Sequence, residues 1–476
     1  MTKKRTDMSP LFHPRAVAVI GAGETPGKVG RIILERLVSH GRTVYPVHPK
    51  LSSLLGLATY PTVNDLPEDT DLAVIALGAE ASVDVAERCA AKGIPFILPV
   101  AGGFSESGGT GAALEARLAA IPEKYASRVL GPNTIGVRSS GDDDGILDTV
   151  FIRVTDRYMA KDKGVAFISQ SGSVAAGALE YAANSGFSLR ALVGLGNKCD
   201  LMETDFIDYF KQDAKSACLM LYLESMDGGK PFLEQLEDFS RAKPVVLLKT
   251  GRTATAAAAV SSHTGKLAGS DNVIDGACRQ FGIVRAYTET QLLDAARVLS
   301  MNPLPKGNRV GMVTSAGGYG VMASDLVETP DRGIELRMGE LLPETMEKIA
   351  KATFSFVSPR NPVDITPSHT EDMLINSLDR VLADPNIDMV LVTAFFATPF
   401  MSPAIIPRLA DHAGRGGKPV LVISRTGKDT EDHLFAMHAH GLTAFPTVDR
   451  AVFGLRCLVE RALWLEQAPA SQRSFS

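Results

Sequence analysis

One histidine stands in a setting that suits covalent chemistry. His263 lies among small and polar residues, with Gly265 close behind it and Asp271 a few residues further on. A neutral imidazole can act as a nucleophile when one ring nitrogen is held as a donor and the other is free. Gly265 would let the backbone fold around an anion, and a helix beginning near Asp271 would present its positive end. The stretch indicates a histidine that carries a phosphoryl group, although a surface histidine without a role fits these residues equally well.

A carboxylate is placed where it could orient that imidazole. Glu224 directly follows the apolar run 219–223, at the point where a buried strand would end. Ligands of open α/β sheets bind outside the carboxyl ends of the strands. A carboxylate there can accept the imidazole N–H and fix its tautomer. The alternative is a glutamate that caps a helix or is solvated.

A turn of small residues forms a candidate anion site. Ser171, Gly172 and Ser173 stand where the apolar run 164–169 changes to helical periodicity. Their small side chains leave backbone N–H groups accessible, and the helix dipole favours an anion. Every open α/β sheet has such a turn, so the signal is weak by itself. A hydrolase nucleophile at Ser171 is not supported, because Ser169 replaces the glycine of Gly-x-Ser-x-Gly and no acid–base pair is spaced to complete a triad.

The start of the chain indicates a nucleotide site. The apolar run 16–20 leads into a turn and then into helical periodicity, so backbone N–H groups can approach a phosphate. The small residues of this turn are Gly21, Ala22, Gly23 and Gly27. A dinucleotide fold usually has an acidic residue after its second strand, but Lys50 follows the strand 43–47 here. A lysine favours coenzyme A over NAD, although a solvated loop lysine fits as well.

The chain repeats one α/β pattern three times. Apolar strands that lead into a small-residue turn and a helix occur at 16–20, 164–169 and 309–314. Strands entered through proline follow later in each repeat, at 95–100, 243–248 and 418–423. Continuous apolar runs alternating with helical patterns predict parallel sheets covered on both faces. We expect three domains, over 1–140, 160–301 and 308–465, with the first closing near residue 138 and 141–145 connecting it to the second.

Composition limits the remaining possibilities. The 476 residues carry a net charge of -5, which gives no support to a nucleic-acid or anionic-membrane partner. No apolar run is long enough to span a bilayer. The five scattered cysteines form no CxxC motif and indicate free thiols in a reducing cytoplasm. His433, His438 and His440 match no common metal pattern, so no metal site is expected.

Four motifs together are more specific than any one of them. They are Ser-His-Thr-Gly-x-Leu-Ala-Gly-Ser-Asp at 262–271, Gly-Pro-Asn-Thr-x-Gly at 131–136, Ser-Gln-Ser-Gly-Ser at 169–173, and Lys-Pro-Val at 243–245 followed by Lys-x-Gly-Arg at 249–252. In these motifs the chain resembles, over nearly its whole length, the α-subunit side of the NDP-forming acyl-CoA synthetases. That family includes ADP-forming acetyl-CoA synthetase and is related to succinyl-CoA ligase. The resemblance implies an α/β fold: an N-terminal Rossmann-like CoA-binding domain, then two flavodoxin-like domains of the succinyl-CoA-ligase type.

The resemblance also implies roles for individual residues. His263 would be the phosphorylated histidine, and Glu224 the glutamate that holds it. The implied CoA-binding residues are Gly21, Ala22, Gly23, Gly27, Lys50 and Asn133. The implied acyl-phosphate and phosphate-binding residues are Ser171, Gly172, Ser173 and Gly265. One departure is Val174-Ala175-Ala176, where succinyl-CoA ligases have an aromatic residue, which disfavours succinate and leaves the acyl group open.

A second departure concerns the nucleotide. The sequence shows no ATP-grasp domain, which single-chain relatives carry after the third unit. A separate ATP-grasp β-type subunit is therefore expected to bind ADP or ATP with Mg²⁺, in a hetero-oligomer. The implied activity converts a small carboxylic acid, ATP and CoA into acyl-CoA, ADP and phosphate, and back, through acyl phosphate and phosphohistidine.

Two alternative functions compete with that activity. One is a CoA-binding or CoA-sensing protein without turnover, and the presence of both His263 and Glu224 argues against it. The other is an NAD(P)-dependent oxidoreductase, suggested by the first glycine turn alone; Lys50 and the lack of an acidic ribose partner count against it.

Overall fold

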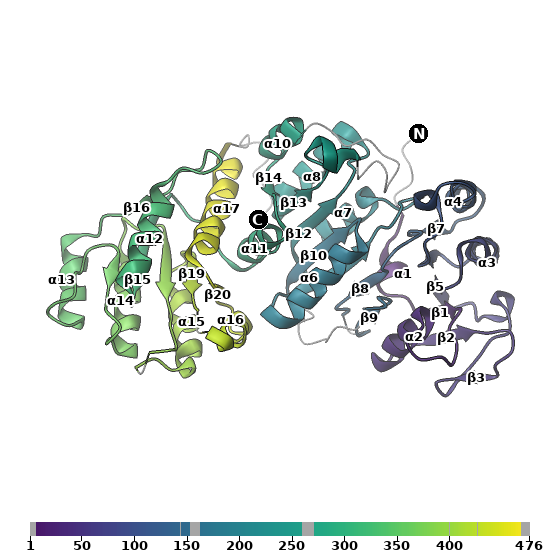
Figure 1. Ribbon diagram of the computed structural model, residues 1–476, viewed down its shortest axis with the longest axis horizontal. Coiled ribbons are helices and arrows are strands. Elements are labelled where there is room, and N and C mark those ends of the chain that lie inside the picture. The colour runs from purple at the N-terminus through teal and green to yellow at the C-terminus, as the bar shows by residue number, and fades with distance from the viewer. Residues whose placement is uncertain are drawn as a thin grey trace. The chain divides into compact units, whose positions relative to one another are not determined.

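The computed structural model describes residues 6–142, 144–152, 162–258, 271–398, 400–425 and 427–467. The chain divides into two compact units (Figure 1). Unit 1 comprises residues 1–180 and 188–287, and unit 2 comprises residues 181–187 and 288–476. None of the helices in the described ranges combines the length and apolar character that crossing a bilayer requires.

The first sheet of unit 1 is parallel, in the strand order β2-β1-β5-β6-β7. Its strands are β1 (Ala16–Ile20), β2 (Val44–Val47), β5 (Thr70–Ile75), β6 (Phe96–Pro99) and β7 (Arg128–Val129). The helices between them are α2 (Val29–Ser39), α3 (Ala79–Lys92), α4 (Gly111–Ala119) and α5 (Ile121–Lys124). Val17 and Val19 belong to one buried cluster while Ala18 and Ile20 belong to another, so both faces of β1 are packed.

The second sheet of unit 1 has the order β14-β13-β12-β10-β11-β8-β9. Its parallel strands are β10 (Gly164–Ser169), β11 (Leu189–Gly194), β12 (Ser216–Leu223), β13 (Val245–Lys249) and β14 (Ile283–Ala286). The helices are α6 (Gly172–Ser185), α7 (Glu203–Gln212), α8 (Gly229–Ala242) and α10 (Asp271–Gln280). The helix expected after the His263 loop is present as α10.

The junction between these two sheets differs from the expectation. Residues 137–148 do not simply connect two domains: β8 (Val137–Ser139) and β9 (Leu147–Asp148) extend the second sheet. β8 pairs antiparallel with β11, and β9 pairs antiparallel with β8. Both strands are short and partly polar, so they lack the apolar run by which the other strands were predicted. Their pairing covers the edge of β11, which would otherwise expose unpaired backbone groups.

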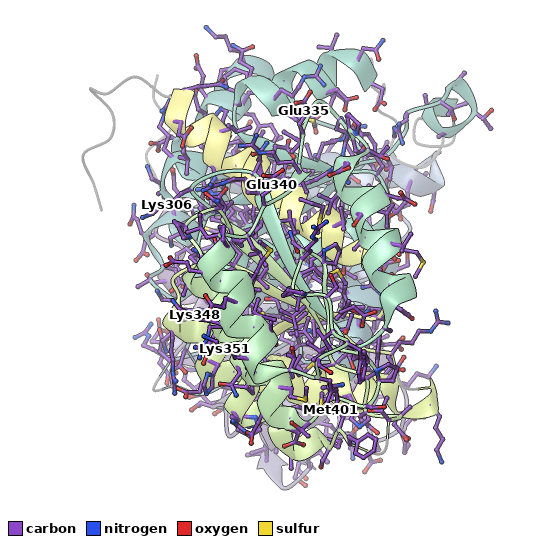
Figure 2. The ribbon with its side chains drawn as sticks, turned by 90° about the vertical axis from the view of Figure 1, so that its left-hand side faces the viewer. Lys306, Glu335, Glu340, Lys348, Lys351 and Met401 are labelled. Atoms are coloured by element: carbon purple, nitrogen blue, oxygen red, sulfur yellow. The ribbon has the colours of Figure 1, made fainter. Side chains whose placement is uncertain are left out.

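Unit 2 holds the third parallel sheet, in the order β16-β15-β18-β19-β20, with β17 also pairing β15. Its strands are β15 (Arg309–Thr314), β16 (Arg337–Met338), β17 (Val363–Asp364), β18 (Met389–Thr393), β19 (Val420–Ile423) and β20 (Thr443–Phe445). Its helices are α11 (Glu289–Met301), α12 (Gly317–Glu328), α13 (Pro343–Ala352), α14 (Glu371–Ala383), α15 (Ile406–Arg415), α16 (Thr430–Ala439) and α17 (Val448–Gln467). Figure 2 shows the side chains of this unit, with Lys348 and Lys351 on α13. The predicted α/β class with parallel sheets is confirmed.

Candidate active site

A pocket of about 430 Å³ lies in unit 1 at the carboxyl edge of the second sheet. Loops of the first sheet supply part of its wall. The lining residues are Val100, Ser105, Glu115, Asn133, Thr134, Ile135, Phe151, Ile152, Gln170, Ser171, Gly172, Ser173, Ala176, Gly196, Asn197, Lys198 and Glu224. The pocket therefore brings together five residues predicted from the sequence: Asn133, the three residues of the small turn, and Glu224.

The turn at Ser171, Gly172 and Ser173 carries the chain from β10 into α6. The hydroxyl of Ser169 donates to the carbonyl of Ser171 at 2.8 Å, and the hydroxyls of Ser171 and Ser173 lie 3.0 Å apart. Gly172 and Ser173 are exposed and line the pocket. The first backbone N–H groups of a helix have no partner within the helix. The turn therefore directs free donors and the positive end of the α6 dipole toward the pocket, an arrangement that suits an anion.

Glu224 lies at the same sheet edge because β10 and β12 are neighbours. Ser169 of β10 is in register with Tyr222 of β12, and Glu224 follows two residues later. Glu224 is 9% exposed and lines the pocket, so it is not the solvated glutamate of the alternative reading. Its backbone N–H donates to the side-chain oxygen of Gln170. The side-chain amide of Gln170, at the end of β10, thus anchors the loop that carries Glu224 at the end of β12.

Asn133 reaches the pocket through a close contact between two loops. Its φ of 57° is in the left-handed region, its N–H donates to the carbonyl of Ala101 at 3.0 Å, and its side chain donates to Asn197 at 3.2 Å. Gly196 touches the same loop, because a Cβ added there would lie 2.1 Å from the carbonyl oxygen of Pro132. The motif at 131–136 and the loop at 196–198 therefore form one wall of the pocket.

Replacing Gly196 with alanine is expected to destabilise this wall. The position has φ +58° in addition to the close approach of Pro132, so the substituted residue would be strained and would push the two loops apart. We expect the free energy of unfolding to fall by about 3 kcal/mol, measured by urea denaturation. Gly276→Ala in α10 is the matched control, since a Cβ there meets nothing within 4 Å. Equal stability of both variants would contradict the packing described.

Several polar residues of the pocket were not predicted from the sequence, among them Gln170, Asn197 and Lys198. Gln170 lies inside the quoted motif at 169–173, so the motif contained the signal. Asn197 and Lys198 follow β11 without any recognised pattern. Asn197 donates to Glu115 at 2.8 Å and also to Glu106, which ties its loop to the first sheet. The Lys198 side chain is only 1% exposed.

The predicted CoA turn lies at a different place in unit 1. Gly21 follows β1 with φ +90°, and a Cβ there would lie 2.5 Å from the carbonyl oxygen of Ala76, so only glycine fits. Gly23 and Gly27 have open space around the Cβ position, and Ala22 is buried. Lys50 is exposed just beyond β2, which pairs with β1. These residues share the carboxyl edge of the first sheet and are not among those lining the 430 Å³ pocket.

His263 and Gly265 lie outside the described residues, but the segments on either side of their loop are described. Arg252, after β13, pairs with Asp271 at 2.9 Å, and Arg285 pairs with the same carboxylate at 2.7 Å. Burial raises the pKa of Asp271, but the hydrogen bonds from Arg252 and Arg285 outweigh it, so that pKa is lower than usual. The described residues contain no group of three or more His, Cys, Asp or Glu suited to holding a metal ion.

Three known protein-family domains match consecutive parts of the chain. A CoA binding domain matches residues 15–140, a succinyl-CoA ligase-like flavodoxin domain matches 162–299, and a Ligase-CoA domain matches 310–463. The α subunit of ADP-forming acetate–CoA ligase I from Pyrococcus furiosus is 32% identical over 464 residues, which are 95% of this chain and 97% of that subunit. The chain is a member of the ADP-forming acyl-CoA synthetase family.

Two further relatives agree with this assignment. ADP-forming acetate–CoA ligase I from Archaeoglobus fulgidus is 35% identical over 385 residues, which are 81% of this chain and 54% of that enzyme. The structure of dinucleotide-forming acetyl-coenzyme A synthetase 1 from Ca. Korarchaeum cryptofilum, in complex with phosphate and ADP, is 32% identical with a TM-score of 0.86. The match covers 97% of this chain and 98% of that one. The resemblance, the fold class and the assignment as a ligase enzyme are confirmed, whereas the roles of individual residues stay predictions.

Proposed function

We propose that this chain is the CoA-binding, phosphohistidine-bearing subunit of an ADP-forming acyl-CoA synthetase. The observation that carries the proposal is the pocket in which Glu224, the Ser171–Gly172–Ser173 turn and Asn133 meet. A carboxylate that can hold an imidazole and a helix N-terminus that can hold an acyl phosphate are what transfer of a phosphoryl group to histidine requires. This family and this pocket together favour the synthetase over a CoA-sensing protein without turnover.

The proposed reaction runs in balanced steps. An oxygen of inorganic phosphate attacks the thioester carbonyl of acyl-CoA, the C–S bond breaks, and CoA leaves as the thiol while acyl phosphate forms. A ring nitrogen of His263 then attacks the phosphorus, the carboxylate leaves, and phosphohistidine remains. The α6 N-terminus offers roughly half a positive charge to the phosphoryl group. Glu224 accepts the other ring N–H and keeps the attacking nitrogen unprotonated. Phosphoryl transfer needs this positioning and charge stabilisation more than covalent assistance.

The final acceptor of the phosphoryl group is proposed to lie on a second subunit. The P. furiosus relative is itself named an α subunit, and this chain spans 97% of it. We therefore expect a β-type ATP-grasp subunit that binds ADP or ATP with Mg²⁺, in a hetero-oligomer. The acyl group is expected to derive from a small carboxylic acid. The five free cysteines fit a reducing, cytoplasmic setting.

The turnover itself is tested with the complete synthetase. The chain is mixed with a candidate ATP-grasp subunit, ATP, Mg²⁺ and CoA, and a series of carboxylic acids is screened for CoA-dependent release of ADP. The proposal expects ADP release with at least one acid. CoA binding without any ADP release from a complex that has formed would favour the sensing protein instead.

The predicted CoA site gives a separate test by ligand titration. We expect the chain to bind CoA and not NAD, because Lys50 stands where a dinucleotide fold would have an acidic ribose partner. Lys50→Ala is expected to weaken CoA binding about tenfold through loss of a charge-assisted phosphate contact. The control is Lys230→Ala on α8, an exposed lysine of the same unit paired with Glu234. Preferential NAD binding would instead support the oxidoreductase reading.

A further inference from the structure

The loop that carries Glu224 is held by side chains from two other segments. This loop, residues 224–227, follows β12, and its central residue Ser225 is only 1% exposed. The Ser225 hydroxyl donates to Asp227 at 3.2 Å and accepts from Gln170 at 3.1 Å and from Lys198 at 3.2 Å. One donor and two acceptor positions are all that a hydroxyl has. The Ser225 hydroxyl thus uses its full hydrogen-bonding capacity to join the loop to Gln170 and Lys198.

Gln170 fixes the backbone of the loop from the β10 side. Its side-chain oxygen accepts the N–H of Glu224 and, at 2.9 Å, the N–H of Ser225. Its side-chain nitrogen makes the bond to the Ser225 hydroxyl. Two consecutive amides bound by one side chain leave the peptide plane before Ser225 little freedom to rotate. Because Gln170 directly precedes the small turn, the same residue links the anion site to the carboxylate.

Lys198 fixes the loop from the opposite side. Its ammonium group lies 2.8 Å from the Asp227 carboxylate and 3.3 Å from the Glu203 carboxylate, besides its bond to Ser225. An ammonium group has three hydrogens, and these three oxygens match them. Lys198 lines the pocket, but its three ammonium hydrogens are matched by oxygens of described residues. It is therefore not expected to bind a substrate anion.

The surroundings of Lys198 show that its position is strongly determined. The backbone of Lys198 has φ 58°, a strained conformation for a non-glycine residue that persists only where the surrounding structure enforces it. Glu203, at the start of α7, is 0% exposed. Lys198 and Glu203 form a buried ion pair, and removing either partner would leave the other as an uncompensated buried charge.

We propose that Lys198 is a positioning residue which, with Gln170, holds the loop at 224–227 so that Glu224 faces the pocket in one orientation. The proposal rests on the proposed function, since the task assigned to Glu224 is to hold the phosphorylated histidine. Lys198 acts through Glu224 and touches no reacting atom. Loss of the lysine lets the loop move, and a displacement of about 1 Å at a reacting group costs about 100-fold in rate.

The first test measures the loop itself and needs no turnover. Lys198→Met is compared with Lys211→Met, a control on α7 that removes a lysine paired with Asp238 at the surface. Hydrogen–deuterium exchange of the amides at 223–228 is expected to speed up about tenfold in Lys198→Met and not in the control. Ser225→Ala, which removes one hydroxyl from the junction, is the second variant should Lys198→Met fail to fold, and the same loop is expected to exchange faster. Unchanged exchange in the folded variants would overturn the proposal.

The second test asks whether Lys198 works through Glu224. The chain is incubated with [³²P]phosphate and the CoA thioester of an acid that supported ADP release in the screen, and the rate of acid-labile labelling is measured. Lys198→Met is expected to lower that rate about 100-fold with CoA affinity unchanged. In a Glu224→Gln background the same change is expected to cost little more, because the group it positions is already lost. An equal cost in both backgrounds would overturn the positioning role. Absence of label in the unmodified chain would reject the proposed function, while the exchange experiment would still decide how the loop is held.

Discussion

Replacement of His263 by alanine is expected to abolish phosphorylation of the chain and to lower turnover of the complete synthetase by at least about 10⁴-fold. The proposed route passes the phosphoryl group through one imidazole nitrogen, and alanine offers no acceptor. Affinity for CoA is expected to stay unchanged, because the predicted CoA turn at Gly21 and Lys50 is a different part of unit 1. The measurements are acid-labile labelling, steady-state release of ADP and a CoA titration.

The matched control for that variant is His440→Ala. His440 is exposed on unit 2, where its ring is hydrogen-bonded to the carbonyl of Ala436 at 2.8 Å, so its loss removes a histidine without touching the pocket. Full activity of His440→Ala together with an inactive His263→Ala variant would assign the loss of phosphorylation to His263. Acid-labile label that persists in His263→Ala would mean that another residue carries the phosphoryl group.

Replacement of Glu224 by glutamine is expected to slow phosphoryl transfer by about 10²–10³-fold without loss of CoA binding. Glutamine keeps the size of the side chain, and the backbone bond to Gln170 remains available. It removes the negative charge that would hold the imidazole N–H and stabilise the ring as the phosphoryl group arrives. The effect should therefore appear in kcat rather than in the KM for CoA. Rapid-quench labelling with [³²P]phosphate and the acyl-CoA identified in the screen, at several acyl-CoA concentrations, separates the rate of transfer from the affinity for the CoA thioester.

Glu237→Gln is the matched control for Glu224→Gln. Glu237 lies on α8 in the same unit and pairs with Arg241 at 2.5 Å, away from the residues that line the pocket. Its replacement should leave labelling intact. If Glu224→Gln labelled as fast as Glu237→Gln, the carboxylate at the end of β12 would have no part in holding the histidine.

The sequence was sufficient to predict the parallel sheets and one sheet edge. Apolar runs such as 164–169 and 219–223 lie on strands β10 and β12, and parallel pairing brings their carboxyl ends together. That alone places the turn at Ser171 beside Glu224. The family motifs then gave the fold class and the ligase assignment, both of which the comparisons confirm. These features are local in sequence or follow from strand periodicity, which is why they could be predicted.

The rest of the pocket depends on contacts between residues far apart in the chain. Lys198 meets Asp227 across two loops, and Asn197 meets Glu115 of α4, 82 positions away in sequence. Neither residue stands in a periodic pattern or beside a recognised motif. The same reason explains β8 and β9, whose pairing with β11 depends on the folded edge rather than on an apolar run. Side-chain networks of this kind are determined by the assembled tertiary structure.

The most direct test of the central claim is to locate the phosphoryl group. The isolated chain is incubated with [³²P]phosphate and the CoA thioester of an acid that supported ADP release in the screen, and is then digested with trypsin at alkaline pH, where phosphohistidine survives. Cleavage after Arg252 and Lys266 releases a peptide of residues 253–266, in which His263 is the sole histidine. The account predicts acid-labile label on this peptide, together with release of free CoA. Release of CoA without label on the 253–266 peptide would contradict the account. Acid-stable label on a serine peptide, such as the one that contains Ser171, would also contradict it.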